Sequence, residues 1–175
     1  MIRFPIADGA RVPFCWARAA RIGLTFRPIA GADLPFLSAL YASTRAEELA
    51  VTPWSDAQKA AFLDMQFRAQ HTYYLAHYPD AAFDVILINH QPAGRLYIDR
   101  ATSEIRIVDI ALLPEWCNRG IGSALINVLQ GEAAAAGKPL RIHVEKFNPA
   151  LRLYERLGFR PIEDKGVYLF MEWRG

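Results

Sequence analysis

The amino-acid sequence predicts a single α/β domain in which a mixed, mostly antiparallel sheet is flanked by helices. From Val108 to Gly158 the pattern is an apolar strand, a glycine-bearing turn, an amphipathic helix, a second strand and a short helix. Residues 82–113, which overlap the beginning of this stretch, have the composition of three consecutive antiparallel strands. Hydrophobic residues make up 53% of the 175 residues, which is enough for one core of ordinary size.

Composition and charge argue against several classes of protein. The 20 Lys and Arg residues against 18 Asp and Glu are scattered, which argues against a nucleic-acid surface. No apolar run approaches the roughly 18 residues of a membrane span. The two cysteines, Cys15 and Cys117, stand far apart without a CxxC pattern, so neither a disulfide framework nor a metal site is expected. A reducing cytoplasm fits this cysteine usage best.

The amino-terminal half is expected to contain an arm, a strand and two helices. Residues 1–21 show no periodicity and contain two prolines, so they are predicted to form an arm ahead of a domain spanning 22–175. A first strand is expected at 24–28. The first helix is expected over 32–41, and the second is expected to follow the N-cap Ser55 and to end near Tyr74.

The second half alternates strands with helices, and its boundaries are marked by glycine, proline and asparagine. Gly137 and Pro139 end the long helix, while Asn148 and Pro149 are expected to start the short one. The expected elements, in order, are strand 82–89, a turn at Gln91 and Pro92, strand 94–99, strand 104–113, helix 120–136, strand 140–144, helix 148–158, strand 158–162 and strand 167–173.

The glycine-bearing turn, PEWCNRGIGSAL, predicts a site for a phosphorylated ligand. Gly120 and Gly122 have no Cβ, so the backbone can approach a ligand closely. The amides of residues 118–123 are expected to point out of a helix start, where the helix dipole offers about half a positive charge. Arg119 adds a formal charge beside them. A diphosphate would satisfy these groups, and a purely structural turn is the alternative.

This turn resembles motif A of the GNAT superfamily of acyl-CoA-dependent N-acetyltransferases. The family signature is Gln or Arg, two residues, Gly, one residue, then Gly or Ala. Cys117 occupies the first signature position and departs from the pattern, so a backbone cradle is implied there without the usual side-chain contact. The segment NPALRLYERLGF is similar to the family's motif B. Together the matching region runs over residues 104–173.

The resemblance implies a GNAT fold of six or seven strands and about four helices, with acetyl-CoA as co-substrate and no metal. Its fourth and fifth strands, here 104–113 and 140–144, are expected to splay apart around the pantetheine arm. The implied coenzyme-binding residues are Ile110, Ala111, Leu112, Leu113, Cys117, Asn118, Arg119, Gly120, Ile121, Gly122, Ser123, Asn148 and Tyr154.

The implied reaction is transfer of an acetyl group to a primary amine by direct attack through a tetrahedral intermediate. A backbone N–H near Leu112 would meet the oxyanion. Tyr154 matches the family's usual general acid, and the alternative for this residue is a core aromatic side chain.

The general base is less clearly implied. The position of the family's usual carboxylate falls on Arg106, so that role does not carry over. Asp109 is the best side-chain candidate, Glu104 and Glu145 are nearby alternatives, and a water chain is a further hypothesis.

The acceptor, a small-molecule or peptide amine, is expected between the loop joining the first two helices and the following strands. Candidate acceptor contacts are Glu47 and Trp54 in that loop region, with Tyr97, Arg106 and His143 on the strands. The alternatives are a solvated loop and a structural histidine.

Two other functional interpretations stay open. One is a GNAT-fold module that binds acyl-CoA as a sensor with little turnover. The other is a dinucleotide-binding protein that shares only the glycine turn, although Leu125 stands at its third glycine position. Many members of the family dimerise, and the apolar segment 167–173 suits a core or a dimer interface equally well.

Overall fold

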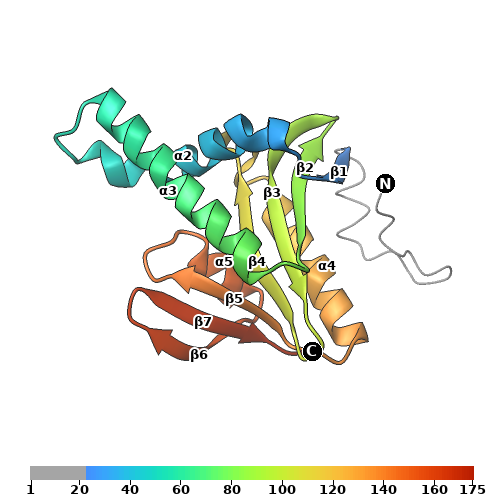
Figure 1. Cartoon of the computed structure of the whole chain (residues 1–175). Helices are drawn as coiled ribbons and strands as arrows, with labels where there is room; N and C mark the ends of the chain where they lie inside the picture. Colours follow the sequence, from blue (N-terminus) through green and yellow to red (C-terminus); the bar gives the residue numbers. More distant parts are fainter. Residues whose placement is uncertain (1–22) are drawn as a thin grey trace.

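The structure is a computed structural model that describes residues 23–175. The predicted arm, residues 1–21, and Cys15 lie outside the described residues. The elements are β1 (Leu24–Pro28), the 3₁₀ helix η1 (Gly31–Asp33), α2 (Leu34–Ala50), α3 (Asp56–His77), β2 (Ala82–Ile88), β3 (Gln91–Arg100), β4 (Ile105–Leu112), the 3₁₀ helix η2 (Pro114–Trp116), α4 (Ile121–Ala135), β5 (Leu140–Glu145), α5 (Leu151–Arg156), β6 (Arg160–Lys165) and β7 (Tyr168–Trp173) (Figure 1).

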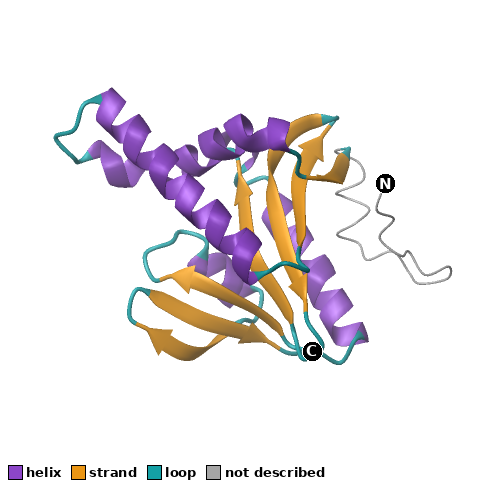
Figure 2. Ribbon diagram, in the orientation of Figure 1, coloured by secondary structure: helices purple, strands orange, loops and turns teal. Residues whose placement is uncertain are grey.

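The strands form one seven-stranded sheet in the order β1-β2-β3-β4-β5-β7-β6. Every neighbouring pair is antiparallel except β4 and β5, which run parallel because α4 returns the chain to the same end of the sheet. Helices lie on both faces of the sheet (Figure 2). The predicted mixed, mostly antiparallel sheet flanked by helices is therefore confirmed.

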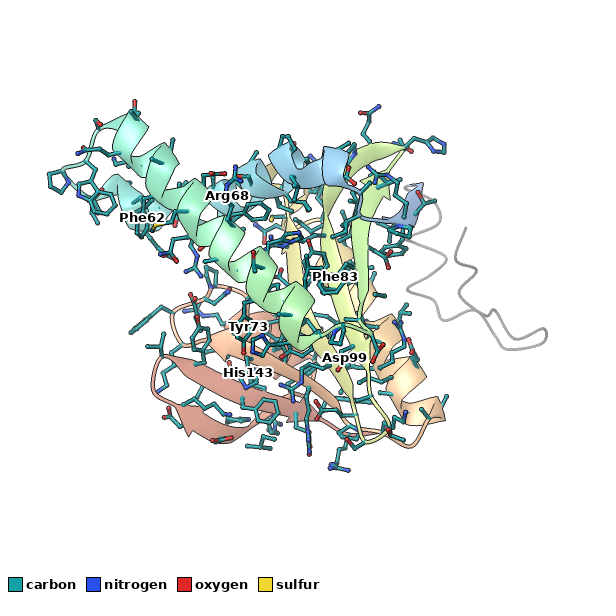
Figure 3. All side chains as sticks on the ribbon, in the orientation of Figure 1. Phe62, Arg68, Tyr73, Phe83, Asp99 and His143 are labelled. Atoms are coloured by element: carbon teal, nitrogen blue, oxygen red, sulfur yellow. The ribbon has the colours of Figure 1, made fainter. Side chains whose placement is uncertain are left out.

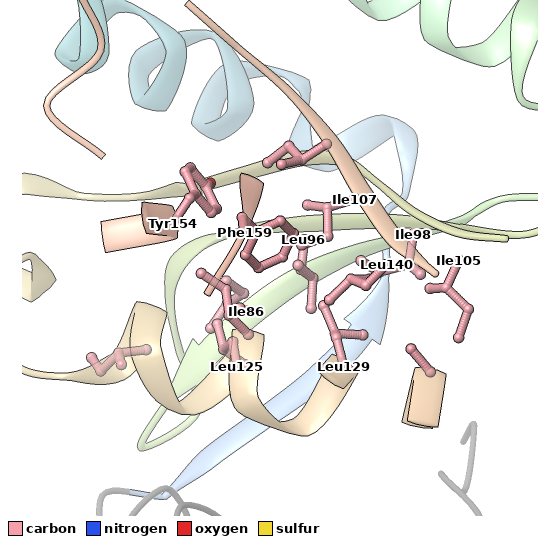
Figure 4. Close-up of a cluster of buried hydrophobic side chains, with 14 of the residues drawn as sticks. Ile86, Leu96, Ile98, Ile105, Ile107, Leu125, Leu129, Leu140, Tyr154 and Phe159 are labelled. Carbon is pink, nitrogen blue, oxygen red and sulfur yellow. The ribbon is translucent and has the colours of Figure 1, made fainter. Parts of the chain in front are cut away.

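The main core lies between the sheet and α4 (Figure 4). In α4 the buried apolar residues recur on one face, among them Leu125, Ile126 and Leu129. They pack against alternate residues of the strands, such as Ile86 and Ile107, which are at most 1% exposed. This packing fixes β4 and the start of α4 relative to each other.

The opposite face is covered in part by α2 and α3, which form a smaller cluster around Leu37, Tyr41 and Phe67. The predicted N-cap Ser55 is confirmed, because its hydroxyl accepts a hydrogen bond from the N–H of Gln58 at 3.3 Å. The Gln58 side chain in turn accepts from the Ser55 N–H at 2.9 Å, which completes a capping box.

Two predicted helix ends were too early. The predicted first helix, 32–41, corresponds to α2, which begins at Leu34 and continues to Ala50. No glycine or proline stands between Tyr41 and Ala50, so nothing local ends the helix at residue 41. The second helix continues past Tyr74 to His77.

The predicted turn at Gln91 and Pro92 is wrong by two residues. The hairpin turns instead at Asn89 and His90, whose φ angles of 49° and 66° are both left-handed. Two consecutive left-handed residues match the twist of a two-residue hairpin, and asparagine adopts this conformation readily. Pro92 lies inside β3 opposite Leu87, next to a bulge at which Ala93 has no partner of its own in β2, and bulges are among the places where a strand tolerates proline.

The predicted start of the short helix at Asn148 is also wrong, since α5 begins at Leu151. The Asn148 side chain accepts a hydrogen bond from the Ala150 N–H at 2.8 Å. Such local bonds let asparagine satisfy the backbone outside a helix, so residues 148–150 form a turn before α5.

Among the helices of residues 23–175, none combines the length and the hydropathy that a membrane span requires. The same residues contain no group of three or more His, Cys, Asp or Glu side chains placed to hold a metal ion.

Candidate active site

A cleft opens where β4 and β5 separate in the middle of the sheet. The two strands pair only from Ile105 with Leu140 to Ile107 with Ile142. Val108 has no partner of its own in β3, because Ile107 and Asp109 face consecutive residues of that strand. Such a bulge bends its strand. The predicted splay of these two strands is therefore confirmed.

The cleft has a volume of about 170 Å³ and is lined from four sides. The edge of β4 contributes residues 108–111, β5 contributes 142–145, and Asn148 and Tyr154 follow β5. Side chains of α2 and α3 line the remaining side. This arrangement brings together Asp109, His143 and Tyr154, which the sequence had placed in three separate segments.

The edge of β4 presents unpaired backbone groups to this cleft. Leu113 donates its N–H to the carbonyl of Ala93 at 2.9 Å, on the β3 side. Because backbone groups alternate along a strand, those of Ile110 and Leu112 point to the opposite side, toward the gap. A ligand lying in the cleft can therefore add to the β4 edge through hydrogen bonds.

The start of α4 provides a second set of free amides. Asn118 and Gly120 both have left-handed backbones, with φ of 58° and 80°. Among the described residues, the N–H groups of 118–123 have no acceptor. Alternating conformations of this kind turn successive N–H groups into one concave, anion-binding surface. These free N–H groups lie at the residues for which the sequence predicted a diphosphate cradle.

Protein packing does not require the glycine at position 122. A Cβ there would meet only the Leu153 side chain, at an ordinary contact distance of 3.5 Å. The side of Gly122 on which a Cβ would stand is therefore open enough for a ligand to approach the backbone.

Cys117 and Arg119 flank the cradle. The exposed Cys117 thiol lies 3.5 Å from the carbonyl of Leu113 and 3.7 Å from that of Leu112. The Arg119 guanidinium lies over the Trp116 ring at 5.0 Å from its centroid. A side chain at position 117 therefore contacts the chain itself, while Arg119 keeps a positive charge beside the free amides.

Tyr154 belongs both to the core and to the cleft. Its ring is 4% exposed and packs edge-on against Phe159 with centroids 5.6 Å apart. Burial raises the pKa of the Tyr154 phenol, and the nearby Asp109 carboxylate raises it further. Tyr154 is therefore a core aromatic side chain that also lines the cleft, and its raised pKa keeps the phenol protonated.

Asp109 accepts three hydrogen bonds from two side chains. Arg95 donates two hydrogen bonds to its two carboxylate oxygens, both at 2.9 Å, and the Tyr74 hydroxyl donates a third at 3.1 Å. Gln70 accepts another N–H of Arg95 at 3.0 Å. The Arg95 side chain is 4% exposed, so this ion pair is almost fully removed from water.

The sequence also matches a known family model. The model for the acetyltransferase (GNAT) domain covers residues 65–161, which is more than half of the chain. The chain belongs to the GNAT acetyltransferase family. It is therefore an acyltransferase, as the resemblance of its two motifs implied.

Solved structures agree with this fold. A PaiA N-acetyltransferase from Thermoplasma acidophilum, determined in complex with coenzyme A, shares 16% identity with a TM-score of 0.64 and covers 87% of this chain and 99% of its own. An acetyltransferase from Thermus thermophilus is 16% identical with a TM-score of 0.63, and the match covers 87% of this chain and 97% of that protein. The ribosomal-protein-S18-alanine N-acetyltransferase from Escherichia coli is 21% identical with a TM-score of 0.55, and the match covers 86% of this chain and 93% of that protein. A comparison with curated proteins found no match.

In this GNAT domain the predicted acceptor residues lie in different places. Arg106 and His143 come together, with an Arg106 nitrogen 3.3 Å from His143 Nδ1, and the rings of His143 and Phe170 stack with centroids 4.4 Å apart. His143 is labelled in Figure 3. Tyr97 is fully buried, with its ring 4.8 Å from that of Phe83, so it is not exposed to an acceptor.

Glu47 and Trp54 are not among the cleft-lining residues. Glu47 is exposed on α2, and Trp54 packs edge-on against Phe62 with ring centroids 5.1 Å apart. The side chains of α2 and α3 that do line the cleft therefore come from other positions on these helices.

One of these positions is Arg45, which flanks the predicted acceptor loop but was not among the predicted acceptor contacts. Arg45 on α2 donates hydrogen bonds of 2.6 and 2.9 Å to the two carboxylate oxygens of Glu145 at the end of β5. The Tyr168 hydroxyl donates to the same carboxylate at 3.2 Å. This clamp of Arg45, Glu145 and Tyr168 joins α2 to β5 and β7 across the mouth of the cleft.

The clamp predicts a pH-dependent contribution to stability. Hydrogen bonding from Arg45 lowers the pKa of Glu145. A lowered carboxyl pKa stabilises the fold above the unfolded value of about 4.3, and this contribution is lost as pH falls through the folded value. Glu145→Gln should therefore reduce the free energy of unfolding at pH 7, and the difference from wild type should shrink below about pH 4.3.

Urea unfolding of both proteins between pH 3 and pH 7 measures this difference. Glu48→Gln is the matched control, because Glu48 also contacts Arg45 but its side chain is 60% exposed. A difference for Glu145→Gln that stays constant across this range would contradict the assignment of the clamp.

Proposed function

We propose that the chain transfers an acetyl group from acetyl-CoA to a primary amine by direct attack. The observation that carries the proposal is the separation of β4 from β5, which places a free strand edge beside Tyr154. The same strand leads through η2 to the free amides at the start of α4. One continuous surface can thus bind the coenzyme and present its thioester to an acceptor.

The described residues fit coenzyme A along this surface. The free amides of 118–123, with Arg119 beside them, suit the diphosphate. The backbone groups of Ile110 and Leu112 that face the gap suit the amides of the pantetheine arm. Asn148, which lines the cleft after β5, is placed to contact the same arm.

The chemical step requires one bond to form and one to break. The neutral amine nitrogen attacks the thioester carbonyl carbon, and the N–H of Leu112 donates to the oxygen as it gains negative charge. The tetrahedral intermediate collapses with cleavage of the C–S bond. Burial keeps the phenol of Tyr154 protonated, so its hydroxyl donates a hydrogen bond to the leaving sulfur as negative charge develops there. The proton that the sulfur takes up from Tyr154 is returned to the phenol by the cleft water that accepts the proton of the amine.

The acceptor must lose a proton, and we assign this step to water in the cleft. Asp109 is the nearest predicted side-chain base, but both of its oxygens already accept hydrogen bonds from Arg95 and one also accepts from Tyr74. We infer that Asp109 acts through these contacts, by holding Arg95 and Tyr74 in place at the cleft wall.

Release of free thiol from acetyl-CoA with a panel of primary amines tests the proposed transfer. Amine-dependent thiol release, with acetylated amine found by mass spectrometry, supports it. Coenzyme A binding without thiol release for any amine would favour a sensor module instead. Thermal shifts by coenzyme A, compared with NAD and ATP, distinguish an acyl-CoA site from a dinucleotide site.

The free amides predict a specific effect of adding one methyl group. Gly122→Ala should weaken coenzyme A binding about tenfold, because the new Cβ stands where the ligand approaches the backbone. The melting temperature should stay the same or rise slightly, since the packing leaves room and alanine favours a helix.

Calorimetric titration with coenzyme A measures this change. Gly131→Ala is the matched control, since a Cβ there meets nothing within 4 Å and the position lies in the middle of α4. The control should gain stability with unchanged affinity. Equal coenzyme affinity in wild type and Gly122→Ala would remove the cradle from the proposal.

A further inference from the structure

The charges inside the cleft are already neutralised by one another. The two carboxylates that line it, Asp109 and Glu145, are each held by two hydrogen bonds from an arginine, Arg95 and Arg45 respectively. A polycationic acceptor would have to displace one of these arginines to reach a carboxylate. Charge complementarity therefore disfavours polyamines and similar acceptors.

The rim of the cleft, in contrast, is apolar and exposed. Phe147 is 94% exposed and lies in the loop between two cleft-lining residues, Glu145 and Asn148. Val167 is 62% exposed and Tyr168, which lines the cleft itself, is 43% exposed. We call the three side chains of Phe147, Val167 and Tyr168 the apolar rim.

The two segments that carry the apolar rim are tied together beside the cleft. The Lys146 N–H donates to the carbonyl of Val167 at 3.0 Å, which ties the loop after β5 to the tip of the β6–β7 hairpin. The Tyr168 hydroxyl bonds to Glu145, at the end of β5. Backbone and side-chain bonds thus hold the rim beside the opening.

The cleft is too small to enclose a whole acceptor molecule. About 170 Å³ is well below the roughly 300–1,000 Å³ of pockets that enclose a drug-sized ligand. The cleft therefore has room for the reacting amine and the thioester, while the body of the acceptor must lie outside, on the rim. Three side chains also provide far less than the roughly 800 Å² per partner of a typical stable dimer.

Resting on the proposed acetyl transfer, we infer that the acceptor is a primary monoamine carried on an uncharged, apolar body, which packs on Phe147, Val167 and Tyr168. Besides the two neutralised carboxylates, the cleft lining includes the side chains of Tyr74 and Tyr168. A free alkylamine or arylalkylamine and the amino terminus of a peptide with an apolar first residue share this chemistry.

The test compares four amines in binding and in turnover with the full chain. Phenethylamine and a tripeptide amide beginning with phenylalanine carry an apolar body, glycinamide carries none, and spermidine is a polycation. Calorimetry with the coenzyme A complex gives affinities, and thiol release from acetyl-CoA gives kcat and KM. Phenethylamine or the tripeptide should bind at least tenfold more tightly than spermidine and glycinamide, and whichever binds better identifies the source.

The variant Phe147→Ser/Val167→Ser tests the rim directly. It should raise the Kd and KM of the preferred amine about tenfold through lost apolar contact, with little change in kcat or in the values for glycinamide. Met65→Ser is the matched control, because Met65 is 55% exposed on α3 and does not line the cleft. It should leave all values unchanged.

The outcomes separate the inference from the proposed function. Preference for spermidine, or unchanged Kd and KM for the apolar amines in the rim variant, overturns the inference even if acetyl transfer occurs. A wild-type dimer that the rim variant converts to a monomer in analytical ultracentrifugation also overturns it. Tight, rim-dependent binding of the apolar amine without thiol release supports the recognition and overturns the proposed transfer.

Discussion

Tyr154→Phe is expected to lower kcat for acetyl transfer by about 10²–10³-fold, within the usual range for loss of a general acid. The phenylalanine ring keeps the edge-on packing against Phe159, so the fold and the affinity for coenzyme A should be preserved. In the proposed mechanism the lost hydroxyl is the group that donates to the leaving sulfur. Thiol-release kinetics, with thermal unfolding as the check on folding, measure the effect.

The pH profile gives an independent check on the same residue. Because burial raises the pKa of Tyr154 above its ordinary value of about 10, the acid form should persist throughout the range from pH 7 to pH 10. No fall in kcat caused by ionisation of Tyr154 is therefore expected in that range. Tyr73→Phe, at a tyrosine that is 52% exposed on α3, is the matched control and should keep wild-type kcat. A Tyr154→Phe enzyme with wild-type kcat would remove Tyr154 from the mechanism.

The parts of the fold that depend on local signals could be predicted from the sequence. Ser55 caps α3 as expected, since a hydroxyl followed three residues later by Gln58 forms a capping box within one turn. The glycine turn before α4 was also identified, because Gly120 adopts the left-handed conformation that favours glycine. In both cases the determining residues are neighbours in the chain.

The acceptor side could not be predicted because it depends on where α2 ends. A helix ending at Tyr41 would have left Glu47 and Trp54 in one loop beside the strands. Since α2 continues to Ala50, Glu47 lies on an exposed helix face and Trp54 packs on Phe62. A change of nine residues in a helix end moves these side chains away from the cleft.

The ion pairs of the cleft join residues far apart in the sequence. Arg45 and Glu145 are 100 positions apart, and no local pattern connects them. Arg95 carried a weaker signal, because a charged residue in an otherwise apolar strand needs a buried partner. Asp109 lies diagonally across from Arg95 on β4, where side chains of antiparallel strands still reach each other. That partner becomes identifiable only once the strand register is known.

Arg95→Met should lower the free energy of unfolding by about 3–5 kcal/mol, because it leaves the Asp109 carboxylate nearly buried without its cation. Denaturant unfolding measures this loss. Arg68→Met is the matched control, since Arg68 forms an ion pair with Asp64 but its side chain is 75% exposed, and the cost there should be below about 1 kcal/mol.

The double variant Arg95→Met/Asp109→Leu should recover most of the stability lost in Arg95→Met, because apolar replacement of a whole buried ion pair is often close to neutral. If the double variant instead lost the sum of the free energies lost in the two single variants, the two side chains would not stabilise each other. The same double variant tests the source of the general base, because it lacks Asp109. If it transfers acetyl groups with an unchanged pH dependence of kcat/KM, water is the proton acceptor. Loss of the acidic limb of that profile would instead assign the base to Asp109, and the ion pair with Arg95 would then hold a catalytic carboxylate in place.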